Sequence, residues 1–227
     1  MSRISKIMQN EYVKSGIVIA VIVIVVLGLF LSLRFVLNTD VPVRVVESGS
    51  MCVPYGYLCD GWSHPFDQTL HVGDIIIIQG VNPEDLNADY PNSDVIVYLN
   101  PTDLSATPIV HRIVAKNEVN GSLYFQTKGD GNPHEKWPAA VPPSDYDSQT
   151  LWPGGPDEGV PADLVLGRVV MRIPWFGHIT LFLQKNPYGL PVIIGLIMLL
   201  LIVEFILPVI RKAKDQEAKT ENAEVTL

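Results

Sequence analysis

Two long apolar runs stand near the ends of the chain. The first covers residues 16–37 ("GIVIAVIVIVVLGLFLSLRFVL") and the second covers residues 189–210 ("GLPVIIGLIMLLLIVEFILPVI"). A helix of about 20 apolar residues is long enough to cross the hydrocarbon core of a bilayer. The alternative for the first run is a cleaved signal peptide, but no small-x-small cleavage site follows it directly. The pattern therefore predicts two uncleaved transmembrane helices.

Between the apolar runs the pattern changes to that of β-strands. Residues 40–47 alternate valine with polar residues, and residues 93–100 and 162–177 are also rich in β-branched residues. The run "GDIIIIQGV" at residues 73–81 has no polar alternation, which predicts a strand buried on both faces. Residues 108–132 form two β-rich runs joined at Asn120–Gly121, which predicts a hairpin with a tight turn. Residues 136–161 are rich in proline and predict a long loop without regular structure.

The basic residues at the chain ends predict how the chain crosses the membrane. They are Arg3, Lys6 and Lys14 before the first run, and Arg211, Lys212 and Lys214 after the second. By the positive-inside rule, residues 1–15 and the charged tail 211–227 are cytoplasmic, and residues 38–188 lie outside. The predicted fold is thus a mainly β extracytoplasmic domain tethered by two transmembrane helices. Glu204 lies within the second run, either as a functional acid or as a partner of the basic residues that follow.

Charge and cysteine content limit the functions that are compatible with residues 38–188. The chain has a net charge of −8, and acidic residues outnumber basic ones by about two to one in residues 38–188. Such a surface argues against nucleic acid as a partner. Cys52 and Cys59 lie in this segment, where an oxidising compartment would favour a disulfide between them. Free thiols are one alternative, and a zinc site with His64 and His71 is another. The ligand spacing argues against zinc, and we expect no metal or organic cofactor.

Three residues could together form a hydrolase site. Ser50 lies in the small-residue turn "ESGSMCVPY", His111 lies in the strand pattern "PIVHRIV", and Asp130 lies between glycines in "TKGDGNP". Singly, each is more typical of a loop or structural residue. Together they supply a nucleophile, a general base and an orienting acid. A tight turn at Asn120–Gly121 would place His111 opposite Asp130 in the hairpin, so we expect a hydrogen bond between them.

A lysine base is the alternative to His111. Lys116 and Lys128 lie on the same predicted hairpin, but a lysine base must be neutral, which requires burial. Neither lies in a run as apolar as "PIVHRIV", so His111 is preferred.

Five motifs occur in the order "SGSM", "HVGDIIII", "VHRIV", "TKGDGNP" and "LGRVVMRIPWFG". This ordered set resembles type I signal peptidases of the archaeal and endoplasmic-reticulum branch, over roughly residues 40–180. The resemblance implies that Ser50 is the nucleophile, His111 the base and Asp130 the acid. It also implies that Ser48 contributes to an oxyanion hole and that shallow pockets accept small side chains. Met51, Ile75 and Ile77 are candidates for the pocket walls.

The sequence departs from the family pattern in three places. The usual Ser-Met-x-Pro becomes "SMCVP", and an insertion that contains Cys59 follows it. A second aspartate is expected about six residues after Asp130, where Lys136 stands instead. Asp130 then acts without that partner, or the adjacent Glu135 substitutes for it.

The resemblance predicts a membrane-bound serine endopeptidase that removes N-terminal signal peptides from exported preproteins after small residues. Its expected partners are the signal peptides and the lipid membrane, with the protein-export channel as a further candidate. We expect an archaeal plasma membrane rather than the endoplasmic reticulum. Two other functions compete: a sortase-like transpeptidase that uses a cysteine with His111 and Arg112, and a non-catalytic binding ectodomain.

Overall fold

The computed structural model describes residues 11–53, 69–132, 134–147 and 159–204. It begins with helix α2 (Glu11–Val36), whose stretch Ser15–Val36 is long and apolar enough to cross a membrane. Isoleucine, valine and leucine side chains along this helix are exposed, and none of the tested stretch is buried within the protein. A helix that is apolar on all sides and buries none of them suits a lipid environment. The first predicted span is therefore present as a helix, close to its predicted bounds.

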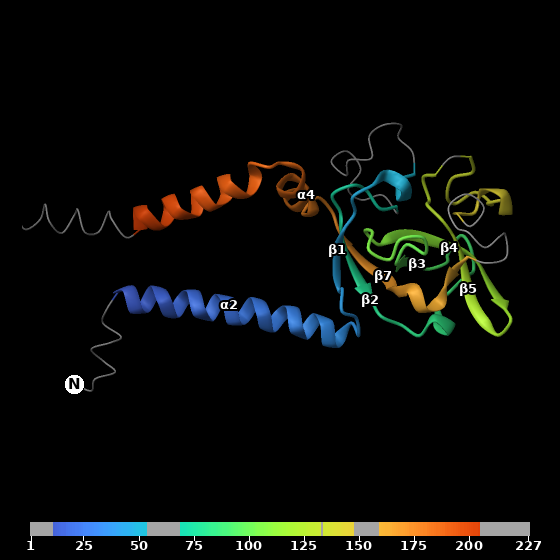
Figure 1. Cartoon of the computed structure of the whole chain (residues 1–227), viewed down its shortest axis with the longest axis horizontal. Helices are drawn as coiled ribbons and strands as arrows, with labels where there is room; N and C mark the ends of the chain where they lie inside the picture. The colour runs from blue at the N-terminus through green and yellow to red at the C-terminus, as the bar shows by residue number, and fades with distance from the viewer. Residues whose placement is uncertain (1–10, 54–68, 133, 148–158, 205–227) are drawn as a thin grey trace, which may run out of the picture. The chain divides into compact units, whose positions relative to one another are not determined.

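The rest of the first compact unit is a single β-sheet with strands of unequal length (Figure 1). Its strands are β1 (Val43–Val45), β2 (Ile75–Gln79), β3 (Val95–Tyr98), β4 (Ile109–Val119), β5 (Ser122–Lys128), β6 (Val160–Pro161) and β7 (Val165–Ile173). They lie in the order β1-β2-β7-β3-β4-β5-β6, and every pairing is antiparallel. The mainly β fold predicted from the alternating pattern is confirmed. The crossover that inserts β7 between β2 and β3 could not be inferred from local pattern.

The hairpin of β4 and β5 turns where the sequence predicted. Asn120 and Gly121 have φ angles of 52° and 79°, in the left-handed region that a type I′ turn requires at both central positions. Val119 pairs with Ser122 directly beside the turn. Further from the turn, the register shifts between Ile113 and Ala115 through a β-bulge. This shift changes which side chains face each other at the open end of the hairpin.

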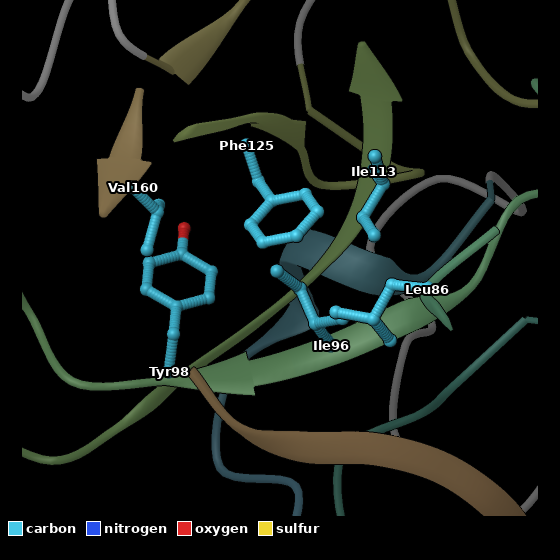
Figure 2. Packing of buried hydrophobic residues seen from close by; sticks show 6 residues of the cluster. All are labelled: Leu86, Ile96, Tyr98, Ile113, Phe125 and Val160. Atoms are coloured by element: carbon cyan, nitrogen blue, oxygen red, sulfur yellow. The ribbon is translucent and has the colours of Figure 1, made fainter. Parts of the chain in front are cut away.

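Two clusters of buried residues hold the sheet. The first gathers from several strands and the loop after β2, as Figure 2 shows for Leu86, Ile96, Tyr98, Ile113, Phe125 and Val160. The second cluster includes Val46, Met51, Leu70, Ile76, Ile78 and Val97. Because Met51 belongs to this second cluster, the turn that carries Ser50 is anchored directly in the core.

The prediction that residues 73–81 are buried on both faces is wrong in its detail. Along β2, Ile76 and Ile78 are fully buried, whereas Ile75 and Ile77 are half-buried. The strand thus alternates in burial like its neighbours, even though its sequence does not alternate. The two buried clusters lie on opposite faces of β3, because Ile96 and Tyr98 belong to the first cluster and Val97 to the second.

The second predicted span is only partly described. Helix α4 (Gly177–Lys185) is followed by an apolar helical stretch Gly189–Glu204, and the two are bent by 111° at the break between them. Within the described residues one helix alone is long and apolar enough to span, and this bent pair would qualify as a second only if counted together. Residues 205–210 and the tail 211–227 lie outside the described part of the chain.

Candidate active site

Ser50 lies in a short 3₁₀ turn, Gly49–Met51, just after β1. The turn is closed by a hydrogen bond from the Cys52 amide to the Gly49 carbonyl oxygen, 3.0 Å long. Met51 and Cys52 are buried, with 1% and 3% of their surface exposed, whereas Ser50 is partly open to solvent. Because Met51 is buried and Ser50 is partly exposed, the Ser50 side chain lies at the surface on a turn that the core holds in place.

His111 lies on β4 and contacts Ser50 directly. Its Nε2 is 3.0 Å from Ser50 Oγ, within the distance at which an imidazole can accept the hydroxyl proton. Its Nδ1 is 2.6 Å from Oδ2 of Asp147, a residue just after a 3₁₀ turn at Pro143–Asp145. With Nδ1 protonated and donating to Asp147, Nε2 is free to accept from Ser50. The three side chains therefore form a hydrogen-bonded series of a hydroxyl, an imidazole and a carboxylate, the groups from which a serine hydrolase site is built.

Asp147 accepts a hydrogen bond from Thr127, whose hydroxyl is in turn hydrogen-bonded to that of Tyr98. Thr127 Oγ1 lies 2.9 Å from Asp147 Oδ2 and 3.0 Å from the Tyr98 hydroxyl. If Thr127 donates to the carboxylate, Tyr98 donates to Thr127. Burial raises the pKa of the Tyr98 phenol well above its usual value, and the Asp147 carboxylate raises it further. Tyr98 therefore stays protonated and able to donate, which fixes the orientation of the acid behind His111.

The structure does not place Asp130 against His111, so the expected hydrogen bond between them is wrong. Asp130 instead accepts two hydrogen bonds of 2.8 Å each from Arg112, at Nε and at Nη2. The bulge in the β4–β5 hairpin explains the difference. It pairs Arg112 with Lys128, the last residue of β5, so Asp130, two residues later in the chain, is in phase with Arg112 rather than with His111. A shift of one residue moves a side chain to the opposite face of the sheet.

Asp130 lies in a loop that packs against the nucleophile turn. The Gly131 amide donates to the Ser50 carbonyl oxygen over 2.8 Å. A Cβ atom on Gly129 would stand 2.5 Å from that same oxygen, and one on Gly131 would stand 2.0 Å from the Cys52 carbonyl oxygen. Only glycine fits such an approach of two backbones. Burial raises the pKa of Asp130, while its hydrogen bonds and charge interaction with Arg112 act in the opposite direction.

The Arg112–Asp130 ion pair is enclosed by further contacts. Arg112 Nη1 donates to the Ser93 carbonyl oxygen over 2.8 Å, and its guanidinium lies 5.1 Å from the Trp137 ring centroid. The Trp137 amide donates to the Asp130 carbonyl oxygen, and its indole nitrogen donates to that of Pro91. Arg112 and Asp130 thus tie the loop after β5 to β4 and, through Gly131, to Ser50.

Ser50 and His111 open into a cleft of about 690 Å³. Its apolar lining comes from the end of β1, from the residues that follow β1, and from β4. These residues are Val45, Val46, Met51, Ile109 and Val110. Its polar lining includes Ser48, Asn132, His134, Asp145 and Asp147. Met51 is among the lining residues of this cleft, whereas Ile75 and Ile77 are not. That Met51 forms the wall of a substrate pocket stays a prediction. Ser48 Oγ lies 3.3 Å from Ser50 Oγ.

The two lysines considered as alternative bases form their hydrogen bonds with other parts of the protein. Lys116 is exposed and donates to the Glu84 carbonyl oxygen, and Lys128 donates to the carbonyl oxygen of Glu135. Glu135 is exposed on the loop after Asp130. His111 is therefore the candidate base that the structure brings to Ser50.

Cys52 is disulfide-bonded, which removes it as a candidate thiol nucleophile. Its predicted partner Cys59 and the alternative zinc ligand His64 lie outside the described residues, so the Cys52–Cys59 pairing stays a prediction. Among the described residues, no group of three or more histidine, cysteine or acidic side chains could hold a metal ion. His71 is buried and lies 3.1 Å from Arg172 through its Nδ1.

Sequence reasoning missed Asp147. The family pattern points to a position about six residues after Asp130, whereas this acid lies further along, within the proline-rich stretch 136–161. The signal available was the pair of aspartates in "SDYD" at residues 144–147. Nothing local distinguishes these acids from surface loop residues, because only the fold brings Asp147 to His111.

Comparison with known proteins gives related sequences with one function. The "Signal peptidase complex catalytic subunit SEC11" of Verticillium alfalfae is 29% identical over 185 residues, covering 78% of this chain and 88% of that protein. Those of Neurospora crassa and Lachancea thermotolerans are 27% and 28% identical, over 78% and 74% of this chain. No family model matches the chain.

The resemblance to type I signal peptidases is confirmed. The same similarities support the prediction that the chain is an enzyme, a protease of the type I signal peptidase kind. These relatives are fungal, so the expectation of an archaeal membrane finds no support in them. The aligned region extends well beyond the five motifs, over most of this chain and of each relative.

Proposed function

We propose that the chain is a membrane-bound serine endopeptidase that removes N-terminal signal peptides from exported preproteins. The observation that carries this proposal is the hydrogen-bonded series from Ser50 through His111 to Asp147, at the wall of an open cleft. The names of the related proteins add the substrate class, because they are catalytic subunits of a signal peptidase complex.

In the proposed mechanism, His111 accepts the Ser50 proton as Oγ attacks the scissile carbonyl carbon. The Asp147 carboxylate holds the Nδ1–H tautomer and stabilises the imidazolium that forms. The Ser48 hydroxyl and the Ser50 amide stabilise the negative charge on the carbonyl oxygen. His111 then returns its proton to the leaving amine. Water, activated by the same imidazole, hydrolyses the acyl-enzyme and releases the signal peptide.

The shape and chemistry of the cleft support a preference for small, apolar residues before the cut. Its apolar lining comes from Val45, Val46 and the start of β4, and β5 pairs with β4 only from Arg112 onward. Ile109 and Val110 pair with β3 along one edge, so an extended substrate could add along their other edge, a common way for proteins to bind peptides. Met51 at the base of this lining would limit the depth available to a side chain.

The proposal places the catalytic unit at a membrane surface. Helix α2 supplies one span, and the apolar stretch that begins at Gly189 supplies the second, with both chain ends cytoplasmic. The lipid membrane and preprotein signal peptides are the proposed partners, and the protein-export channel is a further one. No metal or organic cofactor takes part in the proposed steps.

Cleavage of a purified preprotein with an Ala-x-Ala junction tests this function. The detergent-solubilised wild type should cut once at the junction, whereas Ser50→Ala and His111→Ala should lower kcat by at least about 10³-fold. Ser105→Ala is the matched control, because Ser105 is an exposed loop serine that is not part of the cleft lining. Full cleavage by Ser50→Ala would contradict the nucleophile, and an intact preprotein with every form would favour a non-catalytic ectodomain.

A further inference from the structure

The turn between β4 and β5 carries a sequence that the proposed mechanism does not use. Asn120, Gly121 and Ser122 form the pattern Asn-x-Ser with x other than proline, the acceptor sequon for N-linked glycans. This sequon occurs once in the 227-residue chain. Asn100 is also followed two residues later by a threonine, but Pro101 stands between the two and excludes that site. Asn120 is thus the single asparagine whose sequence context permits glycosylation.

The structure exposes the whole sequon at the tip of the hairpin (Figure 1). Asn120, Gly121 and Ser122 are each exposed to solvent. A Cβ atom on Gly121 would meet no atom within 4 Å, so the space around the turn is open. A glycan is bulky and requires a surface position of this kind. The turn therefore accommodates a glycan without any displacement of the protein.

The side-chain amide of Asn120 is available for reaction. Within the described residues, neither this amide nor the Ser122 hydroxyl forms a hydrogen bond. Asn100 differs, because its Oδ1 accepts from the Thr102 amide over 2.9 Å and from the Thr102 hydroxyl over 2.7 Å. Side-chain contacts of that kind hold an asparagine to its own loop. Asn120 instead presents its carboxamide nitrogen to solvent without such a restraint.

The hairpin tip is remote from the cleft. Asn120 comes nine residues after His111, which corresponds to about 30 Å at the rise of an extended strand. Among the described residues, the lining of the cleft includes β4 as far as His111 and resumes at Asn132, so the hairpin between them does not contribute to it. A glycan on Asn120 therefore leaves the cleft and the contact between Ser50 and His111 open to substrate.

We propose that Asn120 is an acceptor site for an N-linked glycan, transferred from a lipid-linked oligosaccharide on the non-cytoplasmic side of the membrane. This site rests on the proposed function, in which residues 38–188 lie outside. In the transfer, Asn120 Nδ2 forms a bond to the anomeric carbon of the first sugar and loses a proton. The bond between that carbon and the phosphate oxygen of the lipid carrier breaks, and the lipid phosphate leaves with the electron pair. The step involves no oxidation or reduction.

Expression of the full-length protein in a eukaryotic host tests the site. The wild type should migrate on a denaturing gel as a larger species, and peptide N-glycosidase should return it to the size of the unmodified chain. That enzyme converts a glycosylated asparagine to aspartate, so peptide mapping should locate the change at residue 120. An untreated sample controls for spontaneous deamidation, to which Asn-Gly sequences are prone.

Variants of the sequon identify the modified residue. Asn120→Gln and Ser122→Ala should each abolish the shift on the gel, the second without altering the two central residues of the turn. Asn100→Gln is the matched control and should keep the wild-type shift, because Pro101 already excludes modification there. Ser122→Ala should also cleave a preprotein at the wild-type rate, since the hairpin tip does not line the cleft. A shift that persists in Asn120→Gln and Ser122→Ala would overturn the assignment to Asn120.

A second control separates this site from the proposed function. Asp103→Asn creates a further sequon with Leu104 and Ser105, and all three positions are exposed in the loop between β3 and β4. An unmodified wild type beside a modified Asp103→Asn would overturn the inference and leave the outer location standing. If neither protein is modified, the inference fails, and the outer location of residues 38–188 fails with it. A glycosylated wild type that cuts no preprotein would support the site and count against the proposed function alone.

Discussion

At the scale of single residues, the two buried aspartates near Ser50 have different partners. Asp147 contacts the imidazole of His111, whereas Asp130 forms a two-bond ion pair with Arg112. The carboxylates are similar in chemistry and burial, with 3% of each residue exposed. Their effects on catalysis and on stability should therefore separate, because an acid that holds a base acts in the transition state while a buried ion pair acts on the folded state.

Asp147→Asn should reduce kcat by about 10²–10⁴-fold with little change in KM. An amide at this position can present its NH₂ group to Nδ1, which favours the wrong imidazole tautomer. Cleavage kinetics on a preprotein with an Ala-x-Ala junction measure this loss. Glu118→Gln is a suitable control, because Glu118 is an exposed acid on the same hairpin as His111. Wild-type kcat in Asp147→Asn would show that His111 does not depend on this carboxylate.

Asp130→Asn should mainly lower stability. It leaves the Arg112 guanidinium buried without its charged partner, a change that costs about 3–5 kcal/mol for buried ion pairs. Denaturant unfolding of the protein should show this loss, whereas kcat should fall much less than in Asp147→Asn. A stable Asp130→Asn protein with a large loss of kcat would instead assign Asp130 to the chemistry itself.

At the scale of elements, the position of Ser50 depends on close packing between two loops. The 3₁₀ turn at Gly49–Met51 is held by Met51, which is buried in the second cluster, and by the Gly131 amide, which donates to the Ser50 carbonyl oxygen. The β4–β5 hairpin supplies both His111 and, through its bulge, the pairing that turns Arg112 toward Asp130. Because His111 and Arg112 are neighbours on β4, their side chains point to opposite faces of the sheet, His111 toward Ser50 and Arg112 toward Asp130.

Gly131→Ala should therefore lower activity as well as stability. The new Cβ would stand 2.0 Å from the Cys52 carbonyl oxygen and 2.7 Å from its carbon, so the nucleophile turn must move. A displacement of about 1 Å can cost about 10²-fold in rate. Gly121→Ala is the matched control, since Gly121 has a φ of 79° but a methyl group there would meet no atom within 4 Å. We expect the control to lose about 1 kcal/mol of stability and to keep its kcat, and equal kcat losses in both variants would contradict the packing argument.

At the scale of the whole molecule, the proposal requires that both apolar runs cross one membrane. A tag placed at either chain end should then be accessible only from the cytoplasmic side, while a single cysteine introduced at exposed Ser105 should be labelled only from the other side. Labelling with a membrane-impermeant reagent, before and after permeabilisation, distinguishes the two. A C-terminal tag that is accessible from the same side as position 105 would mean that the stretch from Gly189 does not cross.

Much of the fold could be predicted because it depends on local pattern. Valine and isoleucine runs gave six of the seven strands their approximate positions, with the two-residue β6 in the proline-rich region left out. Asn120–Gly121 determined the hairpin turn, because both residues tolerate a positive φ. The apolar run before Leu37 determined α2 through its length and hydrophobicity. These features need no information about distant parts of the chain.

The sequence alone also determined the nucleophile and base candidates, Ser50 and His111, because their residue types and motifs limit the chemistry available. Only the tertiary structure decided which acid contacts His111. A bulge within β4 and β5 shifted the register by one residue, which turned Asp130 toward Arg112, and the proline-rich loop brought Asp147 in its place. Side-chain direction in a sheet has a period of two residues, so one unpredicted irregularity reverses the face. That reversal depends on packing between segments far apart in the sequence, which no local pattern records.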